Sequence, residues 1–260
     1  MRELDINKEI NNICNFIAGY VRQSGMDNVV IGLSGGVDSS LSAALAVTAL
    51  GKEHVYGVML PWKESNSASY EDALSLAEKL GIHHQKIDIT PMVEPYFSIY
   101  QTDADNLRLG NWMARIRMCV LYDLSAKYRA LVLGTSNRTE LLIGYFTQYG
   151  DGACALEPIG HLYKTEVSAM AKVLNIPQQI IDKTPTADLW ADQTDEGEIG
   201  MSYKELDLIL HAITETNLNI RSIINLGFSE ENVLRVKSMM ERTEFKRKNP
   251  PLINDWTLDK

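Results

Sequence analysis

The chain has 260 residues, of which 45% are hydrophobic and 23% charged, so it has the composition and length of a globular protein with one large core. Its formal net charge of -9 excludes a broad nucleic-acid surface, because phosphate backbones select basic faces. No apolar run is long enough to cross a bilayer, and the amino terminus is charged from Arg2 onward. We therefore expect one cytoplasmic domain over residues 1–260, with no membrane or nucleic-acid partner.

The three cysteines, Cys14, Cys119 and Cys154, are widely spaced and fit neither a metal site nor a C-x-x-C motif. This spacing favours a reducing compartment. At the amino terminus, apolar residues recur at helical intervals over residues 7–24 and predict an amphipathic helix that covers a sheet.

Residues 29–50 predict a strand, a tight loop and a helix from residue 39 to residue 50. Gly35 and Gly36 lack the Cβ atoms that would stop a backbone from wrapping an anion, and the helix directs its free amides at the same place. Ser34 and Ser39 add hydroxyl donors. Asp38 would repel a phosphate unless a divalent cation lay between them. The loop is therefore predicted to hold a magnesium-bound polyphosphate.

A strand at residues 54–61, a helix at 68–80 and a strand at 85–89 continue the pattern. This βαβαβ order predicts a parallel sheet with a ligand at the carboxyl ends of its strands. The adenine of a nucleotide is expected near residues 60–62. We class residues 62–67 as a polar segment of small side chains, and we expect this segment to form a mobile flap.

A long helix is predicted at residues 105–127, and its excess of apolar side chains indicates a subunit interface. Arg115 and Arg117 lie on this helix, where solvation and ligand binding are equally good explanations. A fourth buried strand at residues 130–134 opens into a polar loop at 135–140. Glu140 in that loop can cap a helix, form a salt bridge, or supply a second carboxylate for Mg²⁺ beside Asp38.

Residues 145–152 form an aromatic, glycine-rich loop around Asp151. Lys164 is predicted at the start of the helix that follows, where a lysine opposes the helix dipole unless an anion is close. Further helices are predicted at residues 202–215 and 230–248, and the basic tail at 246–251 is interpreted as solvated lysines. The acidic loop at 185–196 is uninformative by itself.

The hexapeptide at residues 34–39 lacks the lysine of the common ATP-binding loop and resembles the loop of the N-type ATP pyrophosphatases. Together with other segments, it resembles the ammonia-dependent NAD synthetases. The matching segments are residues 34–39, 110–118, 134–140, 149–151, 162–166, 185–190 and 193–196. The resemblance implies an α/β fold of the adenine nucleotide alpha hydrolase-like (Rossmann-like) type, a three-layer sandwich around a parallel sheet, with extra C-terminal helices.

The family resemblance also implies a two-step ligase reaction. The carboxylate of deamido-NAD attacks ATP, pyrophosphate leaves, and ammonia then displaces AMP from the acyl adenylate to give NAD. Asp38 and Glu140 would hold Mg²⁺, and Asp151 would hold ammonium and release it as ammonia. The catalytic residues are Asp38, Asp151 and Lys164. The residues that would bind ATP are Gly32, Leu33, Ser34, Gly35, Gly36, Val37, Asp38, Ser39, Thr135, Lys164 and Thr186.

The acid-substrate end departs from the family pattern. Relatives often carry lysine at the position of Gln148, aspartate at Ala155, and histidine at Phe245. The residues that would bind deamido-NAD are Arg115, Tyr122, Gln148, Asp151, Glu198, Phe245 and Lys246. These departures do not affect the prediction that the enzyme adenylates a carboxylate. They leave the alternative that the chain is a paralogous enzyme with a different acid substrate.

The resemblance further implies a homodimer with the dinucleotide across its interface. The synthetase motifs fill the chain and leave no room for a glutaminase domain, so we expect free ammonia or ammonia delivered by a separate protein. A tRNA-thiolating or GMP-forming relative and a catalytically silent nucleotide-binding module are the alternatives. The absence of paired cysteines disfavours thiolation, and the two carboxylates disfavour a silent module.

Overall fold

A four-stranded parallel sheet forms the centre of the computed structural model, which describes residues 2, 4–186 and 193–251. The strands follow the order β3-β2-β1-β4. Val30 on the central strand pairs with Tyr56 on one side and Val132 on the other. The predicted parallel sheet is confirmed. Its strands are β1 (Asn28–Gly32), β2 (Val55–Met59), β3 (His83–Lys86) and β4 (Ala130–Leu133).

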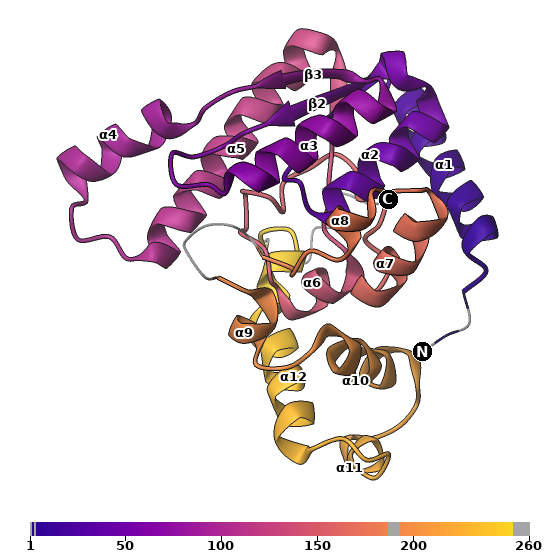
Figure 1. Cartoon of the computed structure of the whole chain (residues 1–260). Helices are drawn as coiled ribbons and strands as arrows, with labels where there is room; N and C mark the ends of the chain where they lie inside the picture. The colour runs from indigo at the N-terminus through magenta and orange to yellow at the C-terminus, as the bar shows by residue number, and fades with distance from the viewer. Residues whose placement is uncertain (1, 3, 187–192, 252–260) are drawn as a thin grey trace.

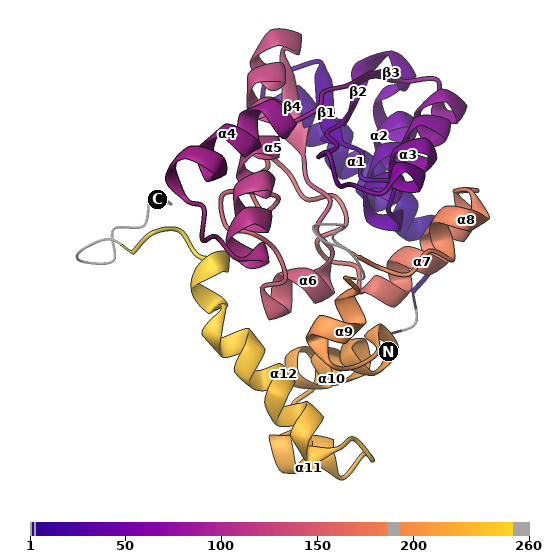
Figure 2. The ribbon, with the colours of Figure 1, turned by 60° about the vertical axis from the view of Figure 1, so that its left-hand side comes forward.

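Helices cover both faces of the sheet, which makes the predicted three layers (Figures 1 and 2). Large buried side chains such as Ile17, Leu41 and Met170 fill one interface, and Val30, Val58 and Met113 lie in the other. One layer contains α1 (Ile6–Gln23), α2 (Val37–Leu50), α3 (Ser67–Leu80), α7 (Lys164–Val173) and α8 (Gln178–Ile181). The opposite layer contains α4 (Thr90–Tyr100) and α5 (Asn106–Tyr128).

The later helices pack around a second hydrophobic core, away from the sheet in Figure 1. Leu206, Ile209 and Leu210 of α10 are fully buried in it, together with Tyr163 from the segment before α7. This core therefore attaches the C-terminal helices directly to the start of α7. The elements are α6 (Arg138–Ile143), α9 (Asp195–Ile199), α10 (Tyr203–Glu215), α11 (Ile220–Ile224), α12 (Glu230–Arg242) and the 3₁₀ turn η2 (Glu244–Arg247).

Several predicted boundaries are wrong, for local reasons. The helix after the glycine loop begins at Val37, because Gly36 in extended conformation already caps it. The third strand runs over His83–Lys86 rather than 85–89, and the second is shorter than 54–61, with a 3₁₀ turn at Lys52–His54 before it. The C-terminal helix ends at Arg242 rather than 248.

Five helices in the described part of the chain are absent from the sequence prediction: α4, α6 and the short helices α8, α9 and α11. The helix α4 begins close to Pro91, and a proline in the first turn loses no helical hydrogen bond. Pro95 lies inside the helix, where it does remove one, and this breaker hides the helix from sequence prediction. The segment predicted as a polar loop at residues 135–140 turns into α6 at Arg138. Asn137 caps α6 by accepting from the Glu140 amide, and the Glu140 carboxylate accepts from the Asn137 amide.

Residues 62–67 are not uniformly polar and exposed. Trp62 is buried in the core beneath α4 and α5, and its amide donates to Ser65 Oγ. Asn66 caps α3 through its side chain. Both ends of the expected flap are therefore held by contacts within the chain. Among the described residues, no helix is long and apolar enough to cross a membrane.

Candidate active site

Two polar loops meet at the carboxyl edge of the sheet, after β1 and after β4, as the sequence predicts. They border a small cavity of about 170 Å³ and a larger one of about 540 Å³. Ser34, Ser69 and Thr135 line both cavities, so the two adjoin. A ligand with a polyphosphate end and a broader body fits this shape. The small cavity is polar, and the glycine loop forms one of its walls.

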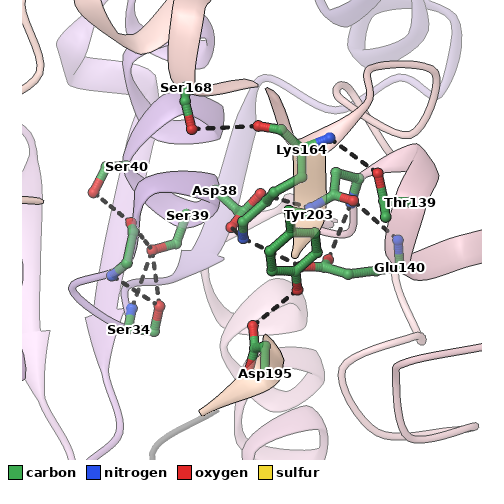
Figure 3. A network of polar contacts seen from close by, with 12 residues as sticks. Ser34, Asp38, Ser39, Ser40, Thr139, Glu140, Lys164, Ser168, Asp195 and Tyr203 are labelled. Carbon is green, nitrogen blue, oxygen red and sulfur yellow. Dashed lines mark hydrogen bonds and ion pairs between the residues drawn. The ribbon is translucent and has the colours of Figure 1, made fainter. Parts of the chain in front are cut away.

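The glycine loop is tightly built. Gly35 has φ +77°, and a Cβ there would lie 2.1 Å from the carbonyl oxygen of Ser69, so a side chain has neither the conformation nor the space. The Ser34 and Ser39 hydroxyl oxygens are 3.1 Å apart, and Ser34 Oγ accepts from the Gly36 amide at 3.2 Å (Figure 3). These hydroxyls lie beside the amino end of α2, where amides favour an anion.

Lys164 lies between two carboxylates at the floor of the small cavity (Figure 3). Its Nζ donates to Asp38 Oδ2 and lies 3.4 Å from Glu140 Oε1. Asn137 Nδ2 donates to Asp38 Oδ1 at 2.9 Å. Only 7% of the Lys164 side chain is exposed. The lysine at a helix start therefore does have anions close to it, and they are carboxylates from α2 and α6.

Burial and the adjacent Asp38 charge raise the pKa of Glu140 to about 8, although Lys164 acts in the opposite direction. Burial lowers the pKa of Lys164, but Asp38 and Glu140 outweigh it and hold that pKa above its ordinary value. Two adjacent carboxylates therefore depend on a single lysine charge. An additional cation at this point would stabilise both ionised forms.

The donor set fits a magnesium ion that arrives with a phosphate ligand. Within the described ranges, no group of three or more His, Cys, Asp or Glu side chains is arranged to hold a metal ion. Mg²⁺ commonly binds through one or two carboxylates and completes its octahedron with phosphate oxygens and water. Asp38 and Glu140 offer those two carboxylates beside the loop that would bind phosphate.

The sequence prediction missed Lys183, which also lines the small cavity, as do the predicted Thr186 and Ser39. Lys183 Nζ donates to Ser69 Oγ at 3.0 Å and to Asp72 Oδ2 at 3.1 Å, so the segment after α8 is tied to α3. Its basic charge two residues before the Pro185-Thr186 pair was the available signal. The motif residues 187–190 lie outside the described residues.

Tyr203 of α10 lies beside Lys164 and contacts Asp195 of α9, and the sequence prediction gave neither residue a role. The Tyr203 ring lies 5.2 Å from Lys164 Nζ, a cation–π distance, and its hydroxyl donates to Asp195 Oδ2 at 2.9 Å. The Tyr145 hydroxyl donates to Glu198 Oε2 at 2.6 Å. The C-terminal helices thus complete the polar floor of the site.

The larger cavity receives residues from both halves of the chain. Leu60 and Pro61 line it at the end of β2, where the adenine is expected, whereas Trp62 is in the core. Arg117 lines it and donates from Nε to the Leu60 carbonyl at 3.0 Å, so this arginine, not Arg115, faces the cavity. The predicted Gly32, Leu33, Asp151, Glu198 and Lys246 also line it.

Asp151 and Lys246 have specific surroundings. Asp151 is exposed at the cavity wall, and its Oδ1 accepts from the Thr147 amide at 2.9 Å; desolvation by the surrounding protein raises its pKa, although that hydrogen bond opposes the shift. Lys246 is not a solvated tail lysine as expected. Its Nζ donates to the carbonyls of Gly144 at 2.7 Å and Phe146 at 2.8 Å.

Four residues predicted to bind the acid substrate lie outside the cavity walls. Arg115 is exposed, and its Nε donates to the Gln148 carbonyl at 3.3 Å. Tyr122 is 41% exposed and Phe245 60% exposed. These four residues therefore do not line the cavity that Asp151, Glu198 and Lys246 share, although Arg115 is close enough to Lys246 that, besides burial, its charge lowers the pKa of that lysine.

Comparisons with known proteins agree with this geometry. Residues 9–250 match the model of a family described as NAD synthase. An NH(3)-dependent NAD(+) synthetase of Fusobacterium nucleatum is 45% identical over 96% of this chain and 97% of its own length.

Two solved structures are similar over nearly the whole chain. An NH3-dependent NAD synthetase of Campylobacter jejuni has a TM-score of 0.83 and 37% identity over 96% of this chain and 100% of its own. An NMN synthetase of Francisella tularensis has a TM-score of 0.86 and 32% identity over 97% of this chain and 100% of its own. The glycine loop, the parallel sheet and the full-length similarity agree: the chain belongs to the NAD synthase family.

Proposed function

We propose that this protein is an ammonia-dependent ligase that amidates deamido-NAD to NAD and converts ATP to AMP and pyrophosphate. One observation carries the proposal: the buried Asp38, Glu140 and Lys164 cluster lies directly beside the glycine loop and next to a cavity large enough for a nucleotide. The family assignment and relatives named NH(3)-dependent NAD(+) synthetases support the same activity.

In the first step, the nicotinate carboxylate attacks the α-phosphorus of ATP and the bond to the pyrophosphate oxygen breaks. Ser34, Ser39 and the loop amides are placed to hold the departing pyrophosphate, and Lys164 and Thr186 line the same small cavity. The polyphosphate end of ATP would therefore lie in the small cavity, with its nucleoside in the larger one near Thr135.

In the second step, ammonium loses a proton to a base, and ammonia attacks the acyl carbon. The attached nitrogen loses a second proton to water, and the bond to AMP breaks so that AMP leaves with its bonding electrons. Asp151 is a suitable base because it faces the larger cavity and its pKa is raised by desolvation. The carboxyl would then release the proton to water. This role for Asp151 is part of the proposal.

Asp38 and Glu140 would hold Mg²⁺ together with phosphate oxygens. Bound there, the ion would neutralise charge on the polyphosphate as it departs. The Asn137 side chain donates a hydrogen bond to the Asp38 carboxylate, and the Asn137 amide donates one to the Glu140 carboxylate. These contacts restrict both carboxylates to orientations toward the small cavity.

We further propose that two copies pair through the face formed by α4 and the amino half of α5. This face exposes Ile99 (65%), Tyr100 (70%) and Leu107 (64%), which is unusually apolar for a surface. It continues toward Arg115 and Tyr122, the predicted substrate residues outside the cavity. A dimer would place those residues beside a shared dinucleotide site. Free ammonia, or ammonia from a separate protein in the cytoplasm, would supply the nitrogen.

Product analysis tests the activity. The purified chain with ATP, Mg²⁺, ammonium and deamido-NAD should form AMP, pyrophosphate and NAD in equal amounts. A parallel reaction with nicotinate mononucleotide is required because one structurally similar protein is named NMN synthetase. ADP in place of AMP would reject adenylation. If the mononucleotide is amidated in preference to deamido-NAD, the proposed reaction is correct and the proposed substrate is wrong.

A further inference from the structure

A fully buried acid on α10, Asp207, lies behind the cluster that holds Lys164. It is 0% exposed and accepts three hydrogen bonds. Thr139 Oγ1 donates to its Oδ1 at 2.5 Å, while the amide and the hydroxyl of Thr165 donate to its Oδ2 at 2.9 and 2.8 Å. Neither the glycine loop nor the cavity walls include Asp207.

The two threonines that Asp207 holds are the chain neighbours of the cluster residues. Thr139 precedes Glu140 at the start of α6, and Thr165 follows Lys164 at the start of α7. The Lys164 amide also donates to Thr139 Oγ1 at 3.0 Å (Figure 3). The Thr139 hydroxyl thus accepts a hydrogen bond from α7 and donates one to α10. Asp207 therefore ties together the amino ends of the two helices that carry Glu140 and Lys164.

This arrangement explains why a charged residue is tolerated in the second hydrophobic core. A buried carboxylate is costly unless its oxygens accept hydrogen bonds, and these oxygens accept three. The amino ends of α6 and α7 both direct positive partial charge toward it. Burial raises the pKa of Asp207, and the contacts from Thr139 and Thr165 oppose that shift.

The same face of α10 also contacts Lys164 directly. Tyr203 is one helical turn before Asp207, and its ring covers Lys164 Nζ. The helix cannot shift easily, because Leu206, Ile209 and Leu210 are fully buried beside these residues. One rigid helix thus contacts the backbone of the cluster through Asp207 and the lysine charge through Tyr203.

We propose that Asp207 is a positioning residue, which acts through Thr139 and Thr165 to hold Glu140 and Lys164 at the distance from Asp38 that binding and cleavage of magnesium-bound ATP require. The proposal rests on the proposed function for its kinetic consequence. Its structural consequence, the affinity of the small cavity for magnesium pyrophosphate, is measurable without any acid substrate.

The main test is Asp207→Asn, which keeps the shape but replaces one acceptor oxygen by a donor, so that the donors of either Thr139 or Thr165 lose their acceptor. We expect kcat to fall about 10²-fold, the scale of an ångström-level misplacement, and the KM for ATP to rise, while the KM for deamido-NAD stays unchanged. Calorimetry should show affinity for magnesium pyrophosphate falling about tenfold, the scale of one charge-assisted hydrogen bond.

Glu205→Gln is the matched control. Glu205 is an acid on the same helix, but its carboxylate accepts from Asn232 Nδ2 of α12 at 2.7 Å, and among the described residues it forms no hydrogen bond or ion pair with α6 or α7. The control should keep wild-type kinetics and pyrophosphate affinity. A second pair of variants keeps the test decisive if Asp207→Asn does not fold. Thr139→Val removes the shared hydroxyl and should reproduce the defect. Thr139→Ser keeps a hydroxyl and should have wild-type kinetics and pyrophosphate affinity.

The proposal is overturned if Asp207→Asn lowers the melting temperature and the active fraction while the surviving enzyme keeps the wild-type KM for ATP and pyrophosphate affinity. It is also overturned if Thr139→Val has wild-type kinetics and pyrophosphate affinity. If wild-type protein binds magnesium pyrophosphate but forms no NAD, the proposed function fails, and the binding comparison still decides the role of Asp207.

Discussion

The phosphate end of the site and the surface predicted to bind the acid substrate are built in opposite ways. At the phosphate end, Asp38, Glu140 and Lys164 are largely buried and each contacts others of the group within one chain. At the acid-substrate surface, Tyr122 and Phe245 are exposed, and Arg115 contacts a backbone carbonyl. The groups proposed to act on ATP thus lie together within one chain, whereas several residues proposed to select the acid lie on surface that a single chain leaves exposed.

The largest expected effect comes from the phosphate end. Asp38→Asn removes one of the two carboxylates proposed to hold Mg²⁺, and we expect activity to fall by at least about 10³-fold. Lys164 keeps Glu140 as a partner, so the melting temperature should stay within about 4 °C of wild type. Turnover by quantification of AMP, with thermal unfolding alongside, checks both statements.

Asp27→Asn is the control for that change, because Asp27 is an exposed acid before β1 and lies outside both cavities. It should behave as wild type. A large drop in melting temperature in Asp38→Asn would mean that Asp38 has a structural role. The phosphate end would then not differ from the acid-substrate surface by being catalytic.

The phosphate end was also the part that the sequence predicted best. A contiguous hexapeptide at residues 34–39 specifies a strand, a turn and a helix, and Gly35 is required there by its positive φ and the adjacent Ser69 carbonyl. Such local rules are written in consecutive residues. The parallel sheet followed for the same reason, since its strands alternate with helices along the chain.

Residues that reach the site by long-range packing were missed. Asp207 meets Thr139 across 68 positions of sequence, and its role depends on where the second core places α10. Arg117 and Arg115 are two residues apart on one helix, and the sequence left solvation and ligand binding open for both. Only the packing of α5 on the sheet determines that Arg117 turns to the cavity and Arg115 outward.

A buried acid at the boundary of the two regions gives a pH-dependent prediction. Glu157 Oε2 accepts from the Ser136 amide at 3.1 Å, and Glu157 contacts Cys154, which lines the larger cavity. Burial raises the pKa of Glu157 from 4.5 to about 7, although the contacts from Cys154 and Ser136 oppose that shift. Between those values the unfolded chain ionises and the folded chain does not, so the native state loses stability as pH rises.

Replacement by glutamine removes this penalty. The free energy of unfolding of Glu157→Gln relative to wild type should increase by about 3 kcal/mol between pH 4.5 and pH 7, and then level off. Denaturant unfolding of both proteins across that range measures it. A difference that does not change with pH would mean that Glu157 ionises normally, and that the boundary is as well solvated as the acid-substrate surface.

The smallest expected effect lies on the acid-substrate surface itself. Gln148→Lys restores the residue that relatives often carry, beside Arg115 on a half-buried segment. An added charge at an exposed site contributes about 0.2–1 kcal/mol, so the KM for deamido-NAD should fall only about two- to fivefold, with the KM for ATP unchanged.

Gln23→Lys, the same exchange on an exposed part of α1, should leave both constants as in wild type. The salt dependence of the Gln148→Lys effect separates two causes. A charge that meets the negatively charged substrate directly should lose its benefit as ionic strength rises, because exposed charges are screened. A gain that persists at high salt would instead mean that Gln148 acts by packing within a better ordered site, and the acid-substrate surface would then resemble the phosphate end more closely than its exposure indicates.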